Sequence, residues 1–333
     1  MKVLVASKSF GKADPAVVAY LEDRGIQVVW SDVPSPSPLD MARQVPGFDA
    51  LIVGNDTVDR RVIEAADRLK IIHMHGTGLD AIDVGAATEK GILVANAPGA
   101  NRNAVAEMTL CLMLALGRRL DKHMALLWQG RWERTAGNEV SGSTVGIIGL
   151  GSIGRRLVEL LSGFRARILG YDPYPDAAWA AENGLEFVED PECIFAKSDW
   201  VVLCAPLSDA TERMVNRRTL GLMKRTAYLV NTARGGLVDE EALCEALRAK
   251  KIAGAALDAF VEEPLPLDSP LRELDILLTP HIAATSKETA AKVSWIVAQN
   301  VASVLLEGST RGAVNAEQIA RRKSATKTIG GLS

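Results

Sequence analysis

Short β-branched runs alternate with helical stretches along the first hundred residues. Five apolar runs predict strands, at residues 2–6, 26–30, 49–53, 70–74 and 91–96. The Pro-rich stretch VPSPSPLD predicts a surface loop that leads into a helix start, not a linker between domains. This part of the pattern predicts a small open α/β sheet.

A second alternating series begins at residue 143. Six buried-strand candidates follow one another up to residue 280: STVGIIG, RILGYD, WVVLCAP, AYLVNTA, AGAALDA and DILLTP. Six parallel strands with crossover helices make a doubly wound sheet. Residues 103–120, between the two series, are apolar on nearly all sides, which predicts a helix that is buried or packed against a partner. We therefore expect a homodimer contact in the 103–140 region.

Length and composition agree with a two-domain α/β protein. A chain of 333 residues exceeds what one hydrophobic core usually organises, and its net charge of −3 argues against a nucleic-acid partner. The four cysteines are far apart and form no C-x-x-C pair, which predicts reduced thiols instead of a disulfide framework or a zinc site. The first apolar run is too short for a secretory signal, and no stretch has 18 uninterrupted apolar residues. We expect a cytoplasmic protein without a membrane partner.

The stretch VGIIGLGSIGRRL contains the candidate dinucleotide site. Gly149, Gly151 and Gly154 have the G-x-G-x-x-G spacing between a predicted strand and a predicted helix, so backbone amides can face a pyrophosphate. Asp172 ends the next strand, 18 residues after Gly154, where a carboxylate can bind a ribose diol and repel the 2′-phosphate of NADP. NAD is the predicted cofactor. The alternative is that the glycines only make a tight turn, and Arg155 can either reach phosphate or face solvent.

Three residues that suit 2-keto acid chemistry follow the last three predicted strands. Arg234 can hold a carboxylate bidentately, His281 can exchange a proton with the carbonyl oxygen, and Glu263 can orient the imidazole and favour its charged form. Residues just past the ends of parallel strands meet at one edge of the sheet. Each residue also has an ordinary explanation, as an ion-pair partner, a surface acid and a core histidine respectively.

Several ordered motifs carry a resemblance to a known family. GLGSIG, NTARGGLVDEEAL, ALDAFVEEP and TPHIAATSKET, together with GTGLDAIDVGAATEKGILVANAPG and QGRWER, resemble the D-isomer-specific 2-hydroxyacid dehydrogenases, most of all their phosphoglycerate dehydrogenase branch. The resemblance covers roughly residues 45–318. It implies a Rossmann NAD-binding domain at residues 99–286, inserted into a flavodoxin-like substrate-binding domain made of residues 1–98 and 287–333. The basic tail from about residue 320 is expected to be a solvated extension.

The resemblance also implies an activity and a set of site residues. The activity is NAD-dependent interconversion of a small D-2-hydroxy acid and its 2-keto acid, of the hydroxypyruvate, glyoxylate or 3-phosphoglycerate type. Arg234, Glu263 and His281 are the implied catalytic residues, and His75, Gly76, Thr77 and Gly78 would bind the substrate carboxylate along with Arg234. The implied cofactor-binding residues are Gly149, Gly151, Ser152, Ile153, Gly154, Asp172, Cys204, Pro206, Thr211, Thr232, Ala233, Arg234, Asp258 and His281.

Departures from the family pattern limit this interpretation. Phosphate-binding members often carry basic residues where this chain has Gly54 and Met74, although Arg131 and Arg134 offer other positive charges. Formate dehydrogenases have glutamine in place of Glu263, so the carboxylate argues against that activity. Transcriptional corepressors similar to the family keep the same three site residues, so an NAD(H)-sensing binding protein remains the alternative. His73 and His75 lack a third ligand nearby, and no metal is expected.

Overall fold

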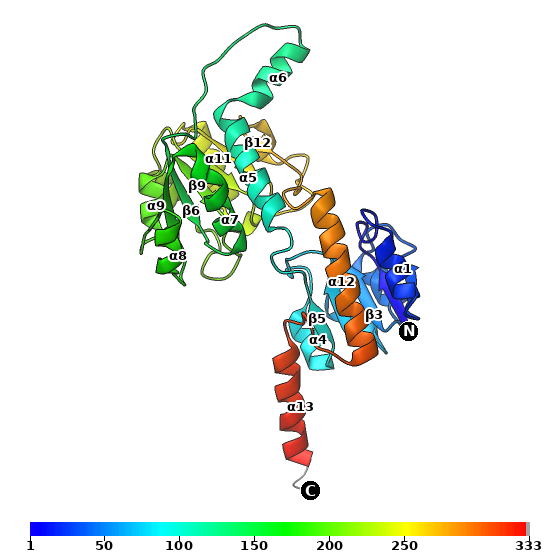
Figure 1. Ribbon diagram of the computed structural model, residues 1–333. Helices are drawn as coiled ribbons and strands as arrows, with labels where there is room; N and C mark the ends of the chain where they lie inside the picture. The colour runs from blue at the N-terminus through cyan, green and yellow to red at the C-terminus, as the bar shows by residue number, and fades with distance from the viewer. Residues whose placement is uncertain (331–333) are drawn as a thin grey trace. The chain divides into compact units, whose positions relative to one another are not determined.

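The computed structural model describes residues 1–330, except the side chains of residues 323 and 325–330, and the chain forms two compact units (Figure 1). Unit 1 comprises Met1–Asn101 and the described residues from Thr285 onward, and unit 2 comprises Arg102–Ala284. Each unit is an α/β layer structure around its own parallel sheet. The fold class predicted from the sequence is therefore confirmed.

Unit 1 has a five-stranded parallel sheet in the order β2-β1-β3-β4-β5, which is the flavodoxin-like order. Its elements are β1 (Lys2–Val5), α1 (Ala16–Glu22), β2 (Gln27–Trp30), α2 (Pro38–Gln44), β3 (Ala50–Val53), α3 (Arg60–Ala65), β4 (Ile71–Met74), α4 (Val84–Lys90), β5 (Leu93–Ala95), α12 (Lys287–Glu307) and α13 (Ala316–Gly330).

Unit 2 has a seven-stranded parallel sheet in the order β12-β11-β10-β9-β6-β7-β8, which contains the Rossmann order. Its elements are α5 (Arg102–Gly117), α6 (Leu120–Trp128), β6 (Thr144–Ile148), α7 (Ser152–Leu161), β7 (Arg167–Tyr171), α8 (Ala177–Glu182), β8 (Leu185–Phe187), α9 (Glu192–Lys197), β9 (Trp200–Leu203), α10 (Arg217–Leu222), β10 (Tyr228–Asn231), α11 (Glu240–Arg248), β11 (Gly254–Leu257) and β12 (Leu277–Leu278), with 3₁₀ turns at Ser162–Phe164, Gly235–Leu237 and Pro270–Glu273.

Polar side chains set the beginnings of several helices. The Ser37 side chain accepts a hydrogen bond from the Asp40 N–H and the Asp40 side chain accepts one from the Ser37 N–H, so α2 starts where the Pro-rich loop was predicted to end. Asp239 caps α11 and Ser286 caps α12 in a similar way, through the amides of Ala242 and Thr289. A side chain that satisfies a free amide at a helix start stabilises the fold by about 1 kcal/mol.

All the strands predicted from the sequence are present, but one further strand was missed. β8 is three residues long, pairs only with β7 and exposes Glu186. Such a short edge strand has too few apolar positions to show an alternation in the sequence. The second sheet therefore has seven strands instead of six.

The apolar stretch at 103–120 forms a largely buried helix, as predicted, but that helix stops before the end of the stretch. The helix α5 ends at Gly117, where a Cβ atom would lie 2.9 Å from the Trp200 ring and 3.0 Å from the Asn138 carbonyl oxygen. Arg119 then adopts a left-handed conformation with φ of 53°, and the separate helix α6 begins at Leu120. Because α5 packs against α7, β10 and β11, its apolar surface is largely used within unit 2.

The last long helix joins the first sheet. α12 packs against α1, β3 and β4, and its apolar residues belong to the core of unit 1. Within the described chain it is the one helix long and apolar enough to cross a membrane, but 56% of its apolar stretch is buried, as in an ordinary core helix. The basic tail continues as α13, which is anchored by the buried Ile319, and residues 331–333 lie outside the described part of the chain.

Candidate active site

The glycine-rich turn between β6 and α7 has room for a phosphate group. Gly149 has φ of +97°, and a Cβ there would lie 2.5 Å from the Ala205 nitrogen, while a Cβ at Gly154 would lie 2.1 Å from the Gly149 oxygen. No atom lies within 4 Å of a Cβ built on Gly151, which caps α7 without a side-chain hydrogen bond. Two glycines thus close the turn and the third leaves the helix N-terminus accessible, as a bound pyrophosphate requires.

Asp172 lies at the end of β7, beside this turn. Its two carboxylate oxygens accept hydrogen bonds from the Leu150 N–H at 2.8 Å and the Tyr174 N–H at 2.9 Å. Each oxygen keeps a second lone pair, so the group can still accept hydrogen bonds from a ribose. The sequence left open whether Arg155 reaches a phosphate or faces solvent. In the structure it donates to the Leu150 carbonyl and pairs with Asp176. The residues of this turn fit a dinucleotide without a 2′-phosphate.

The other expected cofactor residues lie at neighbouring strand ends. Cys204 follows β9, and the Thr211 hydroxyl closes the next loop by donating to the Pro206 carbonyl at 2.7 Å. Thr232 follows β10, and its hydroxyl is hydrogen-bonded to Thr109 of α5 at 2.7 Å. Ser152 and Ile153 form the first turn of α7, and Ala233 lies between Thr232 and Arg234. Their cofactor contacts stay predictions.

Glu263 and His281 are in direct contact. His281 Nδ1 donates to Glu263 Oε2 at 2.7 Å, and Glu263 Oε1 accepts the Phe260 N–H at 3.0 Å. The carboxylate is thus fixed at both oxygens, and the imidazole is left with Nε2 as its other polar atom. The two side chains are about one third exposed, so a substrate can reach them. His281 has a left-handed backbone with φ of 50°, an uncommon conformation for a non-glycine residue that often marks a functional site.

Asp258 holds the turn that carries His281, a role that was not predicted from the sequence. The carboxylate is fully buried at the end of β11 and accepts hydrogen bonds from the Thr279 hydroxyl, the Ile282 N–H and the Ala283 N–H at 2.6, 2.9 and 2.7 Å. The donors come from residues before and after His281, so these hydrogen bonds fix the backbone on either side of it. The expected nicotinamide contact of Asp258 stays a prediction. In the sequence, the only sign of this positioning role was an acidic residue directly after a predicted strand.

The turn that presents Arg234 is fixed by its neighbours. The buried Asn231 side chain accepts the Ala233 N–H at 3.0 Å and donates to the Arg234 carbonyl at 2.9 Å. A Cβ at Gly235 would lie only 1.9 Å from the Phe260 carbonyl carbon, so glycine is required for this close approach. The approach places the Arg234 turn against the segment that leads to Glu263. Arg234, Glu263 and His281 thus follow β10, β11 and β12, three adjacent strands of one sheet.

In unit 1, the segment after β4 presents backbone amides. Within the described chain, the N–H groups of Gly76, Thr77 and Gly78 donate no hydrogen bond to protein atoms. The Gly76 carbonyl accepts a hydrogen bond from the Ala97 N–H, and the Thr77 carbonyl accepts one from the Asn96 side chain at 2.6 Å. Hydrogen bonds to its carbonyl groups therefore fix this segment. Consecutive free amides form a site suited to a carboxylate.

The two histidines of β4 and its end are neutral structural groups. Burial lowers the pKa of His73 and of His75 to about 4. His73 is hydrogen-bonded to the Met74 carbonyl and to Asn300, and His75 lies between the hydroxyls of Ser9 and Ser294, at 2.9 and 2.8 Å. Among the described residues, no group of three His, Cys, Asp or Glu side chains is placed to hold a metal ion.

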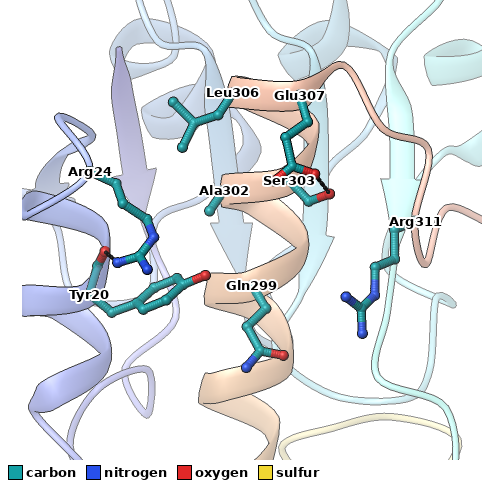
Figure 2. A pocket seen from close by; sticks show the side chains of 8 residues that line it. All are labelled: Tyr20, Arg24, Gln299, Ala302, Ser303, Leu306, Glu307 and Arg311. Carbon is teal, nitrogen blue, oxygen red and sulfur yellow. Dashed lines mark hydrogen bonds between the residues drawn. The ribbon is translucent and has the colours of Figure 1, made fainter.

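A pocket of about 260 Å³ lies between α1 and the last turns of α12 (Figure 2). The Arg24 guanidinium stacks 3.7 Å above the Tyr20 ring and donates to the Tyr20 carbonyl, and Ser303 donates to Glu307. This pocket adjoins the turn that leads into the amino end of β2, whereas ligands of open α/β sheets bind at the carboxyl ends of the strands. We therefore do not assign the chemistry to it.

Comparisons with known proteins agree with the geometry of unit 2. Residues 110–283 match the family model described as D-isomer specific 2-hydroxyacid dehydrogenase, NAD binding domain. The chain is 43% identical over 288 residues to D-3-phosphoglycerate dehydrogenase of Methanocaldococcus jannaschii, covering 85% of this chain and 55% of that protein. It is 39% identical over 292 residues to glyoxylate reductase of Thermofilum pendens, covering 85% of this chain and 86% of that protein.

A solved structure is also similar over nearly the whole chain. The TT0316 protein from Thermus thermophilus superposes with a TM-score of 0.85 at 34% identity, covering 94% of this chain and 100% of that one. The chain spans little more than half the length, 55 to 60%, of several curated phosphoglycerate dehydrogenases that it matches.

Proposed function

Because this chain belongs to the D-isomer-specific 2-hydroxyacid dehydrogenase family and has its NAD-binding domain, we propose that it interconverts a small D-2-hydroxy acid and the corresponding 2-keto acid. The observation that carries the proposal is the contact of His281 with Glu263 at 2.7 Å, in a partly exposed pair on the same sheet as the glycine-rich turn. Substrates of the hydroxypyruvate, glyoxylate or 3-phosphoglycerate type are the candidates.

Each residue of the proposed site has a separate task. In the reductive direction, protonated His281 gives its Nε2 proton to the carbonyl oxygen of the substrate, and Glu263 stabilises the imidazolium before the transfer. Arg234 binds the substrate carboxylate and polarises the carbonyl. Bound NAD(H) supplies or accepts the hydride. In the oxidative direction, neutral His281 takes the hydroxyl proton.

A second candidate for carboxylate binding is the segment after β4 in unit 1. The free amides of Gly76, Thr77 and Gly78 support a role in binding the acid group, whereas His75 has its N–H bonded to the Val53 carbonyl and both ring nitrogens bonded to Ser9 and Ser294. Amide donors suit a carboxylate because they add no charge that must be desolvated. The same segment binds any 2-keto acid, so it does not by itself choose among the candidates.

Steady-state oxidation of NADH with a panel of 2-keto acids tests the function. We expect sustained turnover with at least one small 2-keto acid and the D-isomer of the hydroxy acid as the product, identified by chiral chromatography. Tight NADH binding without turnover of any acid in the panel would instead support an NAD(H)-sensing binding protein.

Cofactor preference is expected to depend on Asp172. The wild-type chain should use NADH in preference to NADPH, because the carboxylate at the end of β7 repels a 2′-phosphate. Asp172→Asn should raise the ratio of kcat/KM for NADPH over NADH by about tenfold, as expected for one charge interaction of about 1.4 kcal/mol. Glu182→Gln, an equal charge change at an exposed side chain at the end of α8, is the control. A wild-type preference for NADPH contradicts this assignment.

Activity is expected to depend on Glu263. Glu263→Gln removes the carboxylate that orients the imidazole of His281 through a hydrogen bond of 2.7 Å, so kcat/KM should fall about tenfold or more in both directions. Glu262→Gln, at the exposed neighbouring residue, should keep the parent activity. Equal activities of the two variants would remove Glu263 from its role.

The proposed assembly is a cytoplasmic homodimer that uses the 103–140 region. α6 has no buried residue and stands away from the layers of unit 2 (Figure 1). This helix and the segment after it expose large apolar side chains. These residues are Leu120, Met124, Leu127, Trp128 and Trp132. Contiguous exposed apolar surface of this kind is typical of a protein interface.

A further inference from the structure

The pocket of about 260 Å³ between α1 and the last turns of α12 contains charged groups that the proposed chemistry does not use (Figure 2). It lies entirely within unit 1. Arg24 and Arg311 line it with positive charge, and Glu307 is the one acid among the described residues that line it. Two cations and one carboxylate leave a net positive charge, so the pocket attracts an anionic ligand.

The Arg24 guanidinium is held in place at one wall of this pocket. It stacks on the Tyr20 ring at 3.7 Å, and its Nη1 donates to the Tyr20 carbonyl at 3.0 Å. The Tyr20 ring is in edge contact with Trp295, with ring centroids 5.5 Å apart, and the Trp295 Nε1–H donates to Asp14 at 2.8 Å. A guanidinium that is already fixed loses little conformational entropy when its other N–H groups bind an acid.

Arg311 reaches the pocket from the segment after α12. Its backbone N–H donates to the Ser309 hydroxyl at 3.1 Å, but its guanidinium has no hydrogen-bond or ion-pair partner among the described residues. The Glu307 carboxylate accepts a hydrogen bond from the Ser303 hydroxyl at 3.1 Å, within α12. The donors of the Arg311 fork are therefore available to a ligand.

The two guanidinium groups are separated in the pocket. Figure 2 shows Arg24 and Arg311 at opposite ends of the lining residues, with the Tyr20 hydroxyl and the Gln299 amide between them. A ligand that contacts both arginines therefore needs an acid group at each end. The volume of about 260 Å³ is slightly below the roughly 300–1,000 Å³ of pockets for drug-sized ligands, so it suits a molecule of a few carbon atoms.

We propose that this pocket binds a short-chain diacid, with one acid group on Arg24 and the other on Arg311. The planar fork of arginine binds carboxylate and phosphate oxygens in the same bidentate way, so dicarboxylates and phosphonocarboxylates both belong to this class. Such a ligand joins α1 to the segment after α12 and stabilises the folded state of unit 1. The inference does not depend on the proposed function.

Isothermal titration calorimetry of the intact chain with three acids tests the inference. Glutarate and 3-phosphonopropionate should each bind at least about tenfold more tightly than pentanoate, which has a single acid group, because only a diacid uses both arginines. The titrations are made at low ionic strength, since salt screens exposed charges. The tighter of the two diacids shows which acid group the pocket prefers, and either order supports the inference.

Substitutions of the two arginines locate the binding site. Arg24→Gln and Arg311→Gln should each weaken glutarate binding about tenfold, to the level of pentanoate. Arg61→Gln is the charge-matched control, because Arg61 is an exposed arginine on α3 that pairs with Asp59, and α3 packs into the other core of unit 1. This control should bind glutarate as the parent does.

Glu307→Gln tests the sign of the ligand charge. Removing the carboxylate should tighten the binding of both diacids severalfold, because the repulsion is lost. Weaker binding in this variant would show that Glu307 contacts a positive group of the ligand, and the diacid class would be wrong.

Thermal unfolding without ligand checks that each variant is folded. Arg311 is exposed and its side chain has no partner among the described residues, so Arg311→Gln decides the matter if the loss of the Arg24 stacking unfolds the other variant. The inference would be overturned by equal affinities for the three acids, by no measurable binding of either diacid, or by glutarate binding that Arg311→Gln leaves unchanged.

Discussion

His281→Ala is expected to reduce keto-acid reduction and hydroxy-acid oxidation by about three orders of magnitude, the usual contribution of a positioned general acid or base. Both directions transfer a proton through the same imidazole, which gives it in reduction and takes it in oxidation, so both should fall together. NADH binding, measured by the change in its fluorescence, should stay within a factor of about three, because the glycine-rich turn and Asp172 lie on β6 and β7. The loss should therefore appear in the chemical step, measured in a single turnover with saturating acid.

The backbone of His281 calls for a second variant. Its φ of 50° lies in the left-handed region, where asparagine is tolerated better than alanine. His281→Asn should therefore keep the turn that Asp258 holds and still lose the proton transfer. If either variant retained more than a tenth of the parent activity, His281 would return to a purely structural role.

Strand positions could be predicted from the sequence because burial on both faces requires continuous apolar runs. The runs at β1, β3, β6, β9, β10 and β11 are each almost fully buried, and each was recognised. β8 was missed because one buried leucine beside an exposed glutamate makes no pattern. The same logic located Arg234, Glu263 and His281, since parallel strands place all their carboxyl ends at one edge.

Long-range partners could not be predicted in this way. Periodicity shows that α12 is apolar, but not that its Ser294 reaches His75, 219 residues earlier in the chain. It shows a glycine at 235, but not the Phe260 carbonyl group that requires it. Asp258 similarly has no sequence signal for the three hydrogen bonds it accepts around His281. Each of these contacts depends on which segments the tertiary fold brings together.

The second large effect is expected for Arg234→Lys, which keeps the charge. A lysine cannot reproduce the planar fork, so at least one charge-assisted hydrogen bond to the substrate should be lost, about 1.5 to 3 kcal/mol. It also loses the bond from Arg234 Nη1 to the Ala233 carbonyl at 2.8 Å, which orients the guanidinium over its own turn. We expect kcat/KM for the keto acid to fall about 100-fold, with NADH affinity unchanged.

The comparison that isolates geometry from charge uses three variants. Arg234→Gln removes the charge as well and should lose more activity than Arg234→Lys. Arg217→Lys, at a mostly exposed arginine that pairs with Glu245, should behave as the parent, because exposed ion pairs contribute little. If Arg234→Lys retained kcat/KM within about fivefold of the parent, the point charge alone would suffice, and the bidentate carboxylate contact would have to be assigned elsewhere. We expect activity to fall in the order Arg217→Lys, Arg234→Lys, Arg234→Gln. That ranking would support Arg234 as the residue that binds the substrate carboxylate through its shape as well as its charge.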